Sequence, residues 1–274
     1  MYKHLLYLTY LLIFFFFIAK LLVVIAKNTI SETRELLEII DLIDPTIEND
    51  ELFVDGKMPI FLDGTHGCIL QNQLLLCGSN NFNPNERKIS YSKDCTIVSP
   101  NYKKLYQMLK LRIDASSVKI SEDSLWILGG LSTYRTSTNC PMIVEKSTEI
   151  VSLNRPPIEG KSLPFAIYGH SMVAVDQHTI YLIGGTLDND SGNPTNQCWI
   201  IDPTNNFDLK PGPSLQVARS EHSSSKIKIN RKIYLVVAGG DNGNSSLDSV
   251  ELLDTTSPHQ GWISGNYEPI FLCN

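Results

Sequence analysis

The sequence predicts an all-β protein built from about four copies of one repeat of roughly 50 residues, preceded by an apolar N-terminal segment. Three observations predict this fold class: glycine pairs that close short apolar runs, histidines that follow a glycine at a fixed distance, and apolar strands flanked by acidic residues. All three recur with the same period. Because independent markers rarely fall into phase by chance, we take the repeat as the structural unit.

Glycine pairs end one apolar run in each repeat. They recur 55 residues apart, from residue 129 to 184 and from 184 to 239. The preceding runs are short and rich in β-branched and aromatic residues, which is typical of buried strands. A degenerate fourth copy ends in Cys77-Gly78. Glycines let the chain turn away where side chains would collide, so we expect structural roles for Gly129, Gly130, Gly184, Gly185, Gly239 and Gly240.

Histidines provide the second marker. Those that follow a glycine by ten residues are His66, His170 and His222. Zinc would require their nitrogens to converge on one ion. Because these histidines occupy equivalent positions of different repeats, we expect them to pack within the structure and to bind no metal.

The third marker is an apolar strand flanked by acidic residues, found at residues 37–41, 148–151, 198–202 and 250–254. The first copy precedes any complete repeat. It predicts either a strand near 36–43 that completes the sheet of the last repeat, or a helix over 31–43, since its apolar residues also fit one helical face. Recurrence of the pattern in later strands favours the strand.

These motifs resemble those of kelch-repeat proteins. The resemblance covers about residues 35–266 and includes the glycine pairs, the aromatic residues Trp199 and Trp262, and the Gly-Pro-Ser-Leu turn at 212–215. It implies a kelch-type β-propeller with four-stranded antiparallel blades. About four blades are expected, over residues 66–115, 116–165, 166–217 and 218–266.

Four blades are at the low end for a closed propeller. The sequence stops where a further blade would start, so we expect a truncated propeller. An open arc exposes sheet edges, and we expect it to aggregate or to need a partner chain to close it.

The N-terminal segment has the order of a secretory signal: a charge, an apolar run, then small residues. We expect cleavage after Ala26. The alternative is an uncleaved anchor, because residues 5–26 are long enough to span a bilayer. Lys20 would then cost about 2.5–3.5 kcal/mol near the bilayer centre. Either way residues 27–274 would enter an oxidising lumen, so we expect a secreted protein or a membrane-anchored luminal propeller.

The chain has six cysteines and no CxxC pair, which argues against zinc modules and redox motifs. In the blade that the resemblance implies, Cys77 ends the second strand and Cys95 begins the third, after a loop over 78–94. Such strand ends face each other within disulfide range. We expect a Cys77–Cys95 disulfide, with Cys68 as a competing partner.

Composition excludes other functions. The net charge is -6 without a basic run, so nucleic acid is not expected as a partner. No arrangement of residues matches a catalytic motif, and we expect neither enzyme activity nor a cofactor.

Recognition is expected from the variable loops that follow the glycine pairs, because loops carry binding residues more often than strands do. Their candidate binding residues are Tyr134, Arg135, Asn189 and Asn242. The resemblance implies a non-catalytic interaction module with a protein partner, or a glycan. Two alternatives remain: a cytoplasmic kelch adaptor and a fragment of a secreted propeller enzyme.

Overall fold

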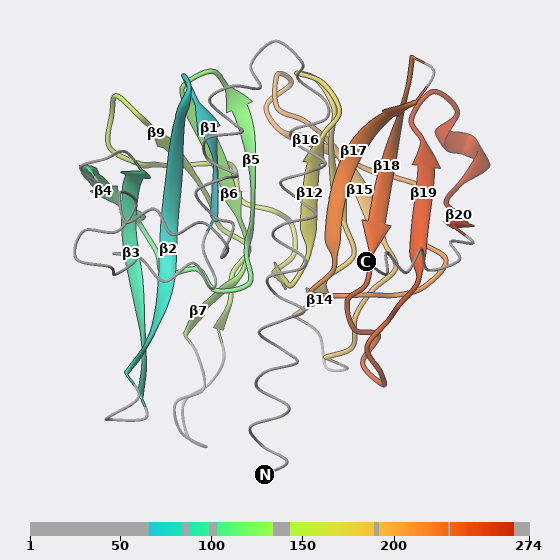
Figure 1. Ribbon diagram of the computed structural model, residues 1–274, viewed down its shortest axis with the longest axis horizontal. Helices are drawn as coiled ribbons and strands as arrows, with labels where there is room; N and C mark the ends of the chain where they lie inside the picture. The colour runs from blue at the N-terminus through green and yellow to red at the C-terminus, as the bar shows by residue number, and fades with distance from the viewer. Residues whose placement is uncertain are drawn as a thin grey trace, which may run out of the picture. The chain divides into compact units, whose positions relative to one another are not determined.

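The computed structural model describes residues 66–83, 88–98, 103–133, 143–188, 192–229 and 231–265. All of them belong to one compact unit, Ile60–Asn274. This unit is all-β, as the repeat predicts, and contains four four-stranded antiparallel sheets (Figure 1). In these ranges the helical element is the short 3-10 turn η2 (Pro258–Gln260). No helix within them has the length and apolar character that crossing a membrane requires.

The four sheets, which we call blades 1 to 4, follow one another along the chain. Blade 1 pairs β1 (His66–Leu70), β2 (Gln73–Asn83), β3 (Lys88–Val98) and β4 (Lys103–Gln107) in that order. Blade 2 pairs β5 (Ser116–Ser121), β6 (Ser124–Leu128), β9 (Thr148–Ser152) and β10 (Ile158–Glu159).

Blades 3 and 4 repeat the arrangement. Blade 3 pairs β12 (Ser171–Ala174), β13 (Ile180–Ile183), β15 (Cys198–Asp202) and β16 (Asp208–Pro211). Blade 4 pairs β17 (Ser223–Ile229), β18 (Lys232–Ala238), β19 (Val250–Asp254) and β20 (Ile263–Gly265). Two small ladders, β7 (Leu131–Thr133) with β8 (Ile143–Val144) and β11 (Ile167–Tyr168) with β14 (Thr186–Leu187), accompany the loops after the glycine pairs.

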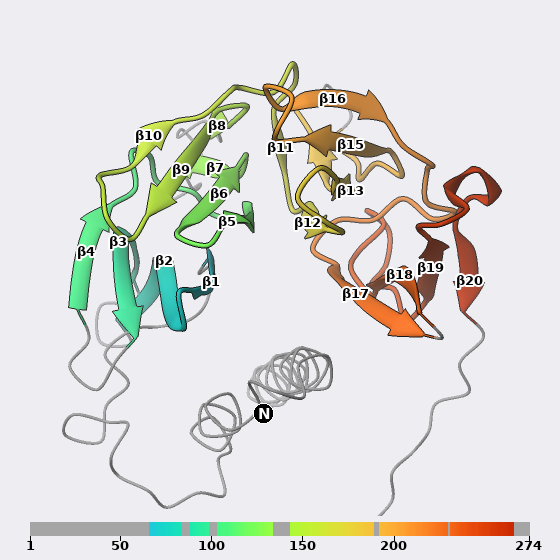
Figure 2. The ribbon, with the colours of Figure 1, turned by 90° about the horizontal axis from the view of Figure 1, so that it is seen from above.

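First strands of successive blades contact one another: β1 with β5, β5 with β12, and β12 with β17. Figure 2 shows these strands innermost, with the fourth strands β4, β10, β16 and β20 outermost. The described sheets do not close into a ring.

One register relates the four blades. The residue before the glycine of the second strand lies opposite one residue of the third strand in each blade, in the pairs Cys77–Cys95, Leu128–Thr148, Ile183–Cys198 and Ala238–Val250. Positions counted from these pairs are therefore structurally equivalent between blades.

Each junction between blades has its own apolar core, because neighbouring residues of a strand point to opposite faces of its sheet. In β13, Ile180 and Leu182 pack into the core shared with blade 2, whereas Tyr181 and Ile183 pack into the core shared with blade 4. A strand buried on both faces needs a continuous apolar run. This explains the uninterrupted runs seen before the glycine pairs.

One detail of blade 1 corrects our expectation. Residues 78–94 do not form a loop; β2 and β3 continue to pair as far as Asn83 and Lys88. A bulge at Gly78, whose φ is +75°, interrupts the register and allows the ladder to continue. The expected signal or anchor at 1–26 and the closing strand near 36–43 lie outside the described residues.

Candidate functional site: the blade junctions and the loop face

The glycine pairs lie where one blade meets the next. A Cβ on Gly184, whose φ is +56°, would lie 2.6 Å from the carbonyl oxygen of Arg219 and 2.8 Å from Cε1 of His222. Its neighbour Gly185 donates its N–H to the Arg219 carbonyl at 2.8 Å, and Gly130 makes the equivalent 2.8 Å bond to Ile167. The glycines therefore allow the backbones of two blades to come close enough to form hydrogen bonds with each other.

The histidines pack on these glycines. His222 contacts Gly184 of the preceding blade and Gly240 of its own blade, while its Nε2 is hydrogen-bonded to the Ser171 hydroxyl at 2.8 Å. His170 occupies the equivalent position one blade earlier, against Gly129 and Gly185. Burial and the nearby Arg219 charge lower the pKa of His222 to about 3.

The third histidine is not equivalent. His66 is the first residue of β1, whereas His170 and His222 each come just before the first strand of their blade. Its Nε2 donates to the Arg112 carbonyl at 3.1 Å. Burial lowers its pKa to about 4. Equal spacing from a glycine in the sequence thus does not fix an equal position in the sheet, because the linkers vary in length.

Burial lowers the pKa of His170 to about 3, with contributions from His222 and His66. Neither ring nitrogen of His170 has a hydrogen-bond partner among the described residues. Within those ranges, no three His, Cys, Asp or Glu side chains are arranged to hold a metal ion.

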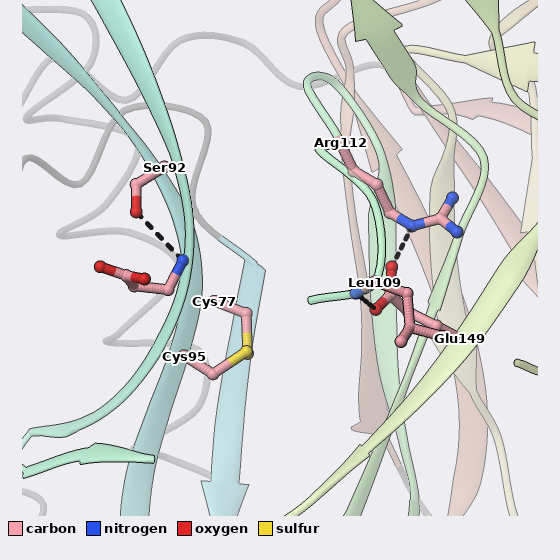
Figure 3. The surroundings of a disulfide bond; sticks show 7 residues. Cys77, Ser92, Cys95, Leu109, Arg112 and Glu149 are labelled. Carbon is pink, nitrogen blue, oxygen red and sulfur yellow. Dashed lines mark hydrogen bonds and ion pairs between the residues drawn. A yellow bond between two sulfur atoms is a disulfide. The ribbon is translucent and has the colours of Figure 1, made fainter. Parts of the chain in front are cut away.

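Two buried ion pairs hold the linkers between blades, and the sequence interpretation missed both. Arg112 Nε donates to Glu149 Oε1 at 2.6 Å, and the second carboxylate oxygen accepts the Leu109 N–H at 2.7 Å (Figure 3). Both side chains are almost fully buried. Arg112 also donates to the carbonyls of Gly129 and Ser147, which ties the linker to the end of β6.

The same unit recurs between blades 3 and 4. Arg219 Nη2 donates to Glu251 Oε1 at 2.8 Å, and Arg219 also bonds the carbonyls of Gly239 and Ser249. Glu251 additionally accepts the N–H groups of Gln216 and Val217. The acidic residues of the strand pattern therefore include buried structural carboxylates.

Blade 3 replaces this ion pair with apolar side chains. Ile167 stands four residues before the first strand of its blade, as Arg112 and Arg219 do, and Trp199 stands at the glutamate position by the shared register. Trp199 packs on Phe165 with ring centroids 4.5 Å apart. The same place in the blade is therefore filled in two ways, by a buried ion pair in blades 2 and 4 and by apolar side chains in blade 3.

The Cys77–Cys95 disulfide predicted from the sequence is present, between directly opposed residues with Cα atoms 4.0 Å apart (Figure 3). It lies in the core between blades 1 and 2. The competing partner Cys68 is a free, half-buried thiol, and Cys198 is free and buried. Burial raises the pKa of each of these thiols to about 12, so both stay protonated at neutral pH.

Of the candidate binding residues, Tyr134, Arg135 and Asn189 lie outside the described residues. Asn242 lies in the loop between β18 and β19, and its side-chain oxygen accepts the N–H groups of Asn244 and Ser245, both at 2.9 Å. Asn242 therefore shapes the loop, while the side chains of Asn244 and Ser245 are exposed.

The loops that follow two successive glycine pairs lie against each other. A Cβ on Gly243 would lie 3.1 Å from Cδ of Pro194 and 3.5 Å from Oδ1 of Asn193. Thr195 is held to Gly185, and Leu247 to Gly240, by backbone hydrogen bonds of 2.8 and 2.7 Å. Residues 192–197 of blade 3 and 241–248 of blade 4 thus form one surface, which we call the loop face.

Sheet order, register and packing on both faces define the class: an all-β, propeller-like protein of four-stranded antiparallel sheets. No family model and no curated protein matches the sequence. Among solved structures, the chain is similar to that of YjhT, with a TM-score of 0.60 and 13% sequence identity over 76% of this chain and 71% of that one. At this identity the similarity supports the fold alone.

Proposed function

We propose that the protein is a secreted or luminal binding module of the kelch-repeat type, and that it recognises a partner protein through the loop face. One observation carries the proposal. Loops from two successive blades pack side by side and present exposed amide and hydroxyl groups, including those of Asn244, Ser245 and Ser246. Loops held on a rigid scaffold are the usual place for recognition residues.

Use of the buried polar groups supports binding rather than catalysis. Arg112, Glu149, Arg219 and Glu251 all hold linkers against strands at blade junctions. Because these side chains form hydrogen bonds that stabilise the fold, we expect recognition by residues at the surface. A glycan is the second candidate ligand, because side-chain amides and hydroxyls also bind sugar hydroxyls.

The disulfide supports an oxidising compartment, since structural disulfides are rare in the cytosol. The apolar residues 5–26 would deliver the chain there, as a cleaved signal or as the membrane anchor. Asn244 begins an Asn-Ser-Ser sequon that is exposed and would be usable in that compartment.

Expression of the full chain in a secretory cell tests the compartment. We expect protein in the medium that lacks residues 1–26 and whose intact mass is two hydrogens lower for the Cys77–Cys95 bridge. Cytosolic protein with an intact N-terminus and free thiols would refute the proposal.

Proximity labelling on living cells with a peroxidase fusion tests the loop face. Ser245→Arg places a long charged side chain on this face while keeping the sequon. We expect it to abolish labelling of the partner protein that the unchanged fusion labels. The matched control is Asn205→Arg, in the exposed turn before β16. Because that turn is at the other end of β15, labelling should persist. Equal labelling by both variants would place recognition elsewhere.

A further inference from the structure

Among the described residues, one face of blade 4 is only partly buried, whereas the other three blades bury the same face. The face of blade 3 turned toward blade 4 contains Tyr181, Ile183 and Cys198, which are 3%, 0% and 2% exposed. By register, the equivalent residues of blade 4 are Val236, Ala238 and Val250. All three are only partly buried.

The same positions are buried in the first two blades. In blade 1 they are Leu75, Cys77 and Cys95, each 0% exposed. In blade 2 they are Trp126, Leu128 and Thr148, at most 2% exposed. In the part of the chain that the structure describes, three copies of this face therefore have a blade packed on them and the fourth has none.

This partly buried face continues across the sheet to its outer edge. Val236 lies opposite Leu252, and Leu252 lies opposite Ile263 of β20. Ile263 is 58% exposed, the highest among the exposed large apolar side chains of the described residues. We call Val236, Ala238, Val250, Leu252 and Ile263 the trailing face.

On the opposite side of blade 1, apolar residues are less buried than their equivalents in the other blades. Leu74 and Leu76 point away from blade 2 and are partly buried. Their equivalents Leu125 and Ile127 in blade 2, Ile180 and Leu182 in blade 3, and Leu235 and Val237 in blade 4 are at most 1% exposed. We call the surface around Leu74, Leu76 and Ile69 the leading face.

We infer that the trailing face of one molecule packs on the leading face of a second copy, in the geometry that joins successive blades within the chain. Three internal junctions show that a trailing face fits a leading face, and both unused faces belong to the same chain. Such an interface joins two different surfaces, so repeated use gives a closed ring or an open chain of molecules. This self-association is distinct from the proposed function and uses another surface.

Sedimentation velocity of the full chain, as cells process it, over a range of concentrations tests the inference. We expect the average mass to at least double as concentration rises. Ile263→Lys should weaken association at least about 10-fold, because a buried ammonium without a partner is costly. Ile263 is already exposed, so this substitution leaves folding intact, which far-UV circular dichroism checks. The control Ile158→Lys changes a 43% exposed residue on the outer strand of blade 2 and should associate like the unchanged protein.

A crosslink tests the pairing of faces. In the junction between blades 3 and 4, Tyr181 and Val237 share one core, and they correspond to Val236 and Leu76. Mixing Val236→Cys protein with Leu76→Cys protein under mild oxidation should give a disulfide-linked dimer that contains both variants. Val236→Cys mixed with Ile158→Cys should not.

Three outcomes would overturn the inference. The first is a monomer at every concentration whose trailing face binds an apolar dye, and the second is a monomer in which hydrogen exchange shows that face covered by the chain's own remaining residues. The third is association that Ile263→Lys leaves unchanged.

Discussion

Replacing Arg219 with methionine should be among the most destabilising single changes to this protein. Arg219 is 0% exposed and Glu251 is 1% exposed, and their side chains are joined at 2.8 Å. Methionine fills similar volume without a charge. The Glu251 carboxylate would then keep only the N–H groups of Gln216 and Val217.

Removing one partner of a buried ion pair costs about 3–5 kcal/mol, because the remaining charge is left uncompensated. The double variant Arg219→Met/Glu251→Gln removes both charges while the glutamine oxygen can still accept a backbone N–H. We therefore expect its cost to fall below the sum of the single variants by about 1–3 kcal/mol. Blade 3 supports this, since Ile167 and Trp199 occupy the same two positions without charge.

Urea unfolding followed by tryptophan fluorescence measures these free energies. Lys119→Met is the control: Lys119 pairs with Glu122 at 2.9 Å, but the glutamate is 83% exposed. Its loss should cost less than about 1 kcal/mol. A cost for Arg219→Met no larger than that of the control, or full additivity in the double variant, would refute this account of the junction.

Three further predictions concern acid stability, the glycine pairs and the disulfide. Because burial lowers the pKa of His170 to about 3, the unfolded chain binds a proton before the folded one does, and the protein loses stability as pH falls below 6.5. At pH 5 the loss is about 2 kcal/mol, and His170→Gln should reduce by that amount the difference between the free energies of unfolding in urea at pH 7 and at pH 5. Gly184→Ala should destabilise by more than Gly261→Ala, since both glycines have positive φ but only Gly184 has atoms within 3 Å of the added Cβ; equal melting temperatures would contradict this. The bridge between Cys77 and Cys95 spans 18 residues, so replacing both cysteines with alanine should cost about 3 kcal/mol in chemical unfolding, whereas a cost near zero would show that the bridge adds nothing.

Much of the fold could be predicted because the residue types that mark the repeat have few structural roles. Glycine pairs, apolar runs and the Cys77–Cys95 pair are local signals, and the structure places them in all-β, four-stranded sheets with that disulfide. The ladder beyond Gly78 was missed because glycine was interpreted as the end of a strand, whereas here it forms a bulge.

Part of the candidate site depends on contacts that no local pattern reveals. The sequence pattern identified Glu149 and Glu251 only as acidic residues of apolar strands, and their arginine partners lie 37 and 32 residues earlier in the chain. One signal was available: Arg112 and Arg219 each stand four residues before the first strand of a blade. The positions of Tyr134, Arg135 and Asn189 remain predictions from the sequence.

The shared construction of each junction has a consequence for how such a chain can gain or lose length. Gly184 belongs to blade 3 but contacts His222 of blade 4. Arg219 precedes blade 4, yet its carbonyl accepts the N–H of Gly185 in blade 3. A duplication or deletion that begins and ends at corresponding points of two blades, such as His170 and His222, would regenerate the contacts of the glycine pair with the histidine and with the carbonyl three residues before it, which the junctions between blades 2 and 3 and between blades 3 and 4 share. One that cuts at any other spacing would leave a histidine without its glycine. The heritable module is therefore the full period, whichever point of it is chosen as the start.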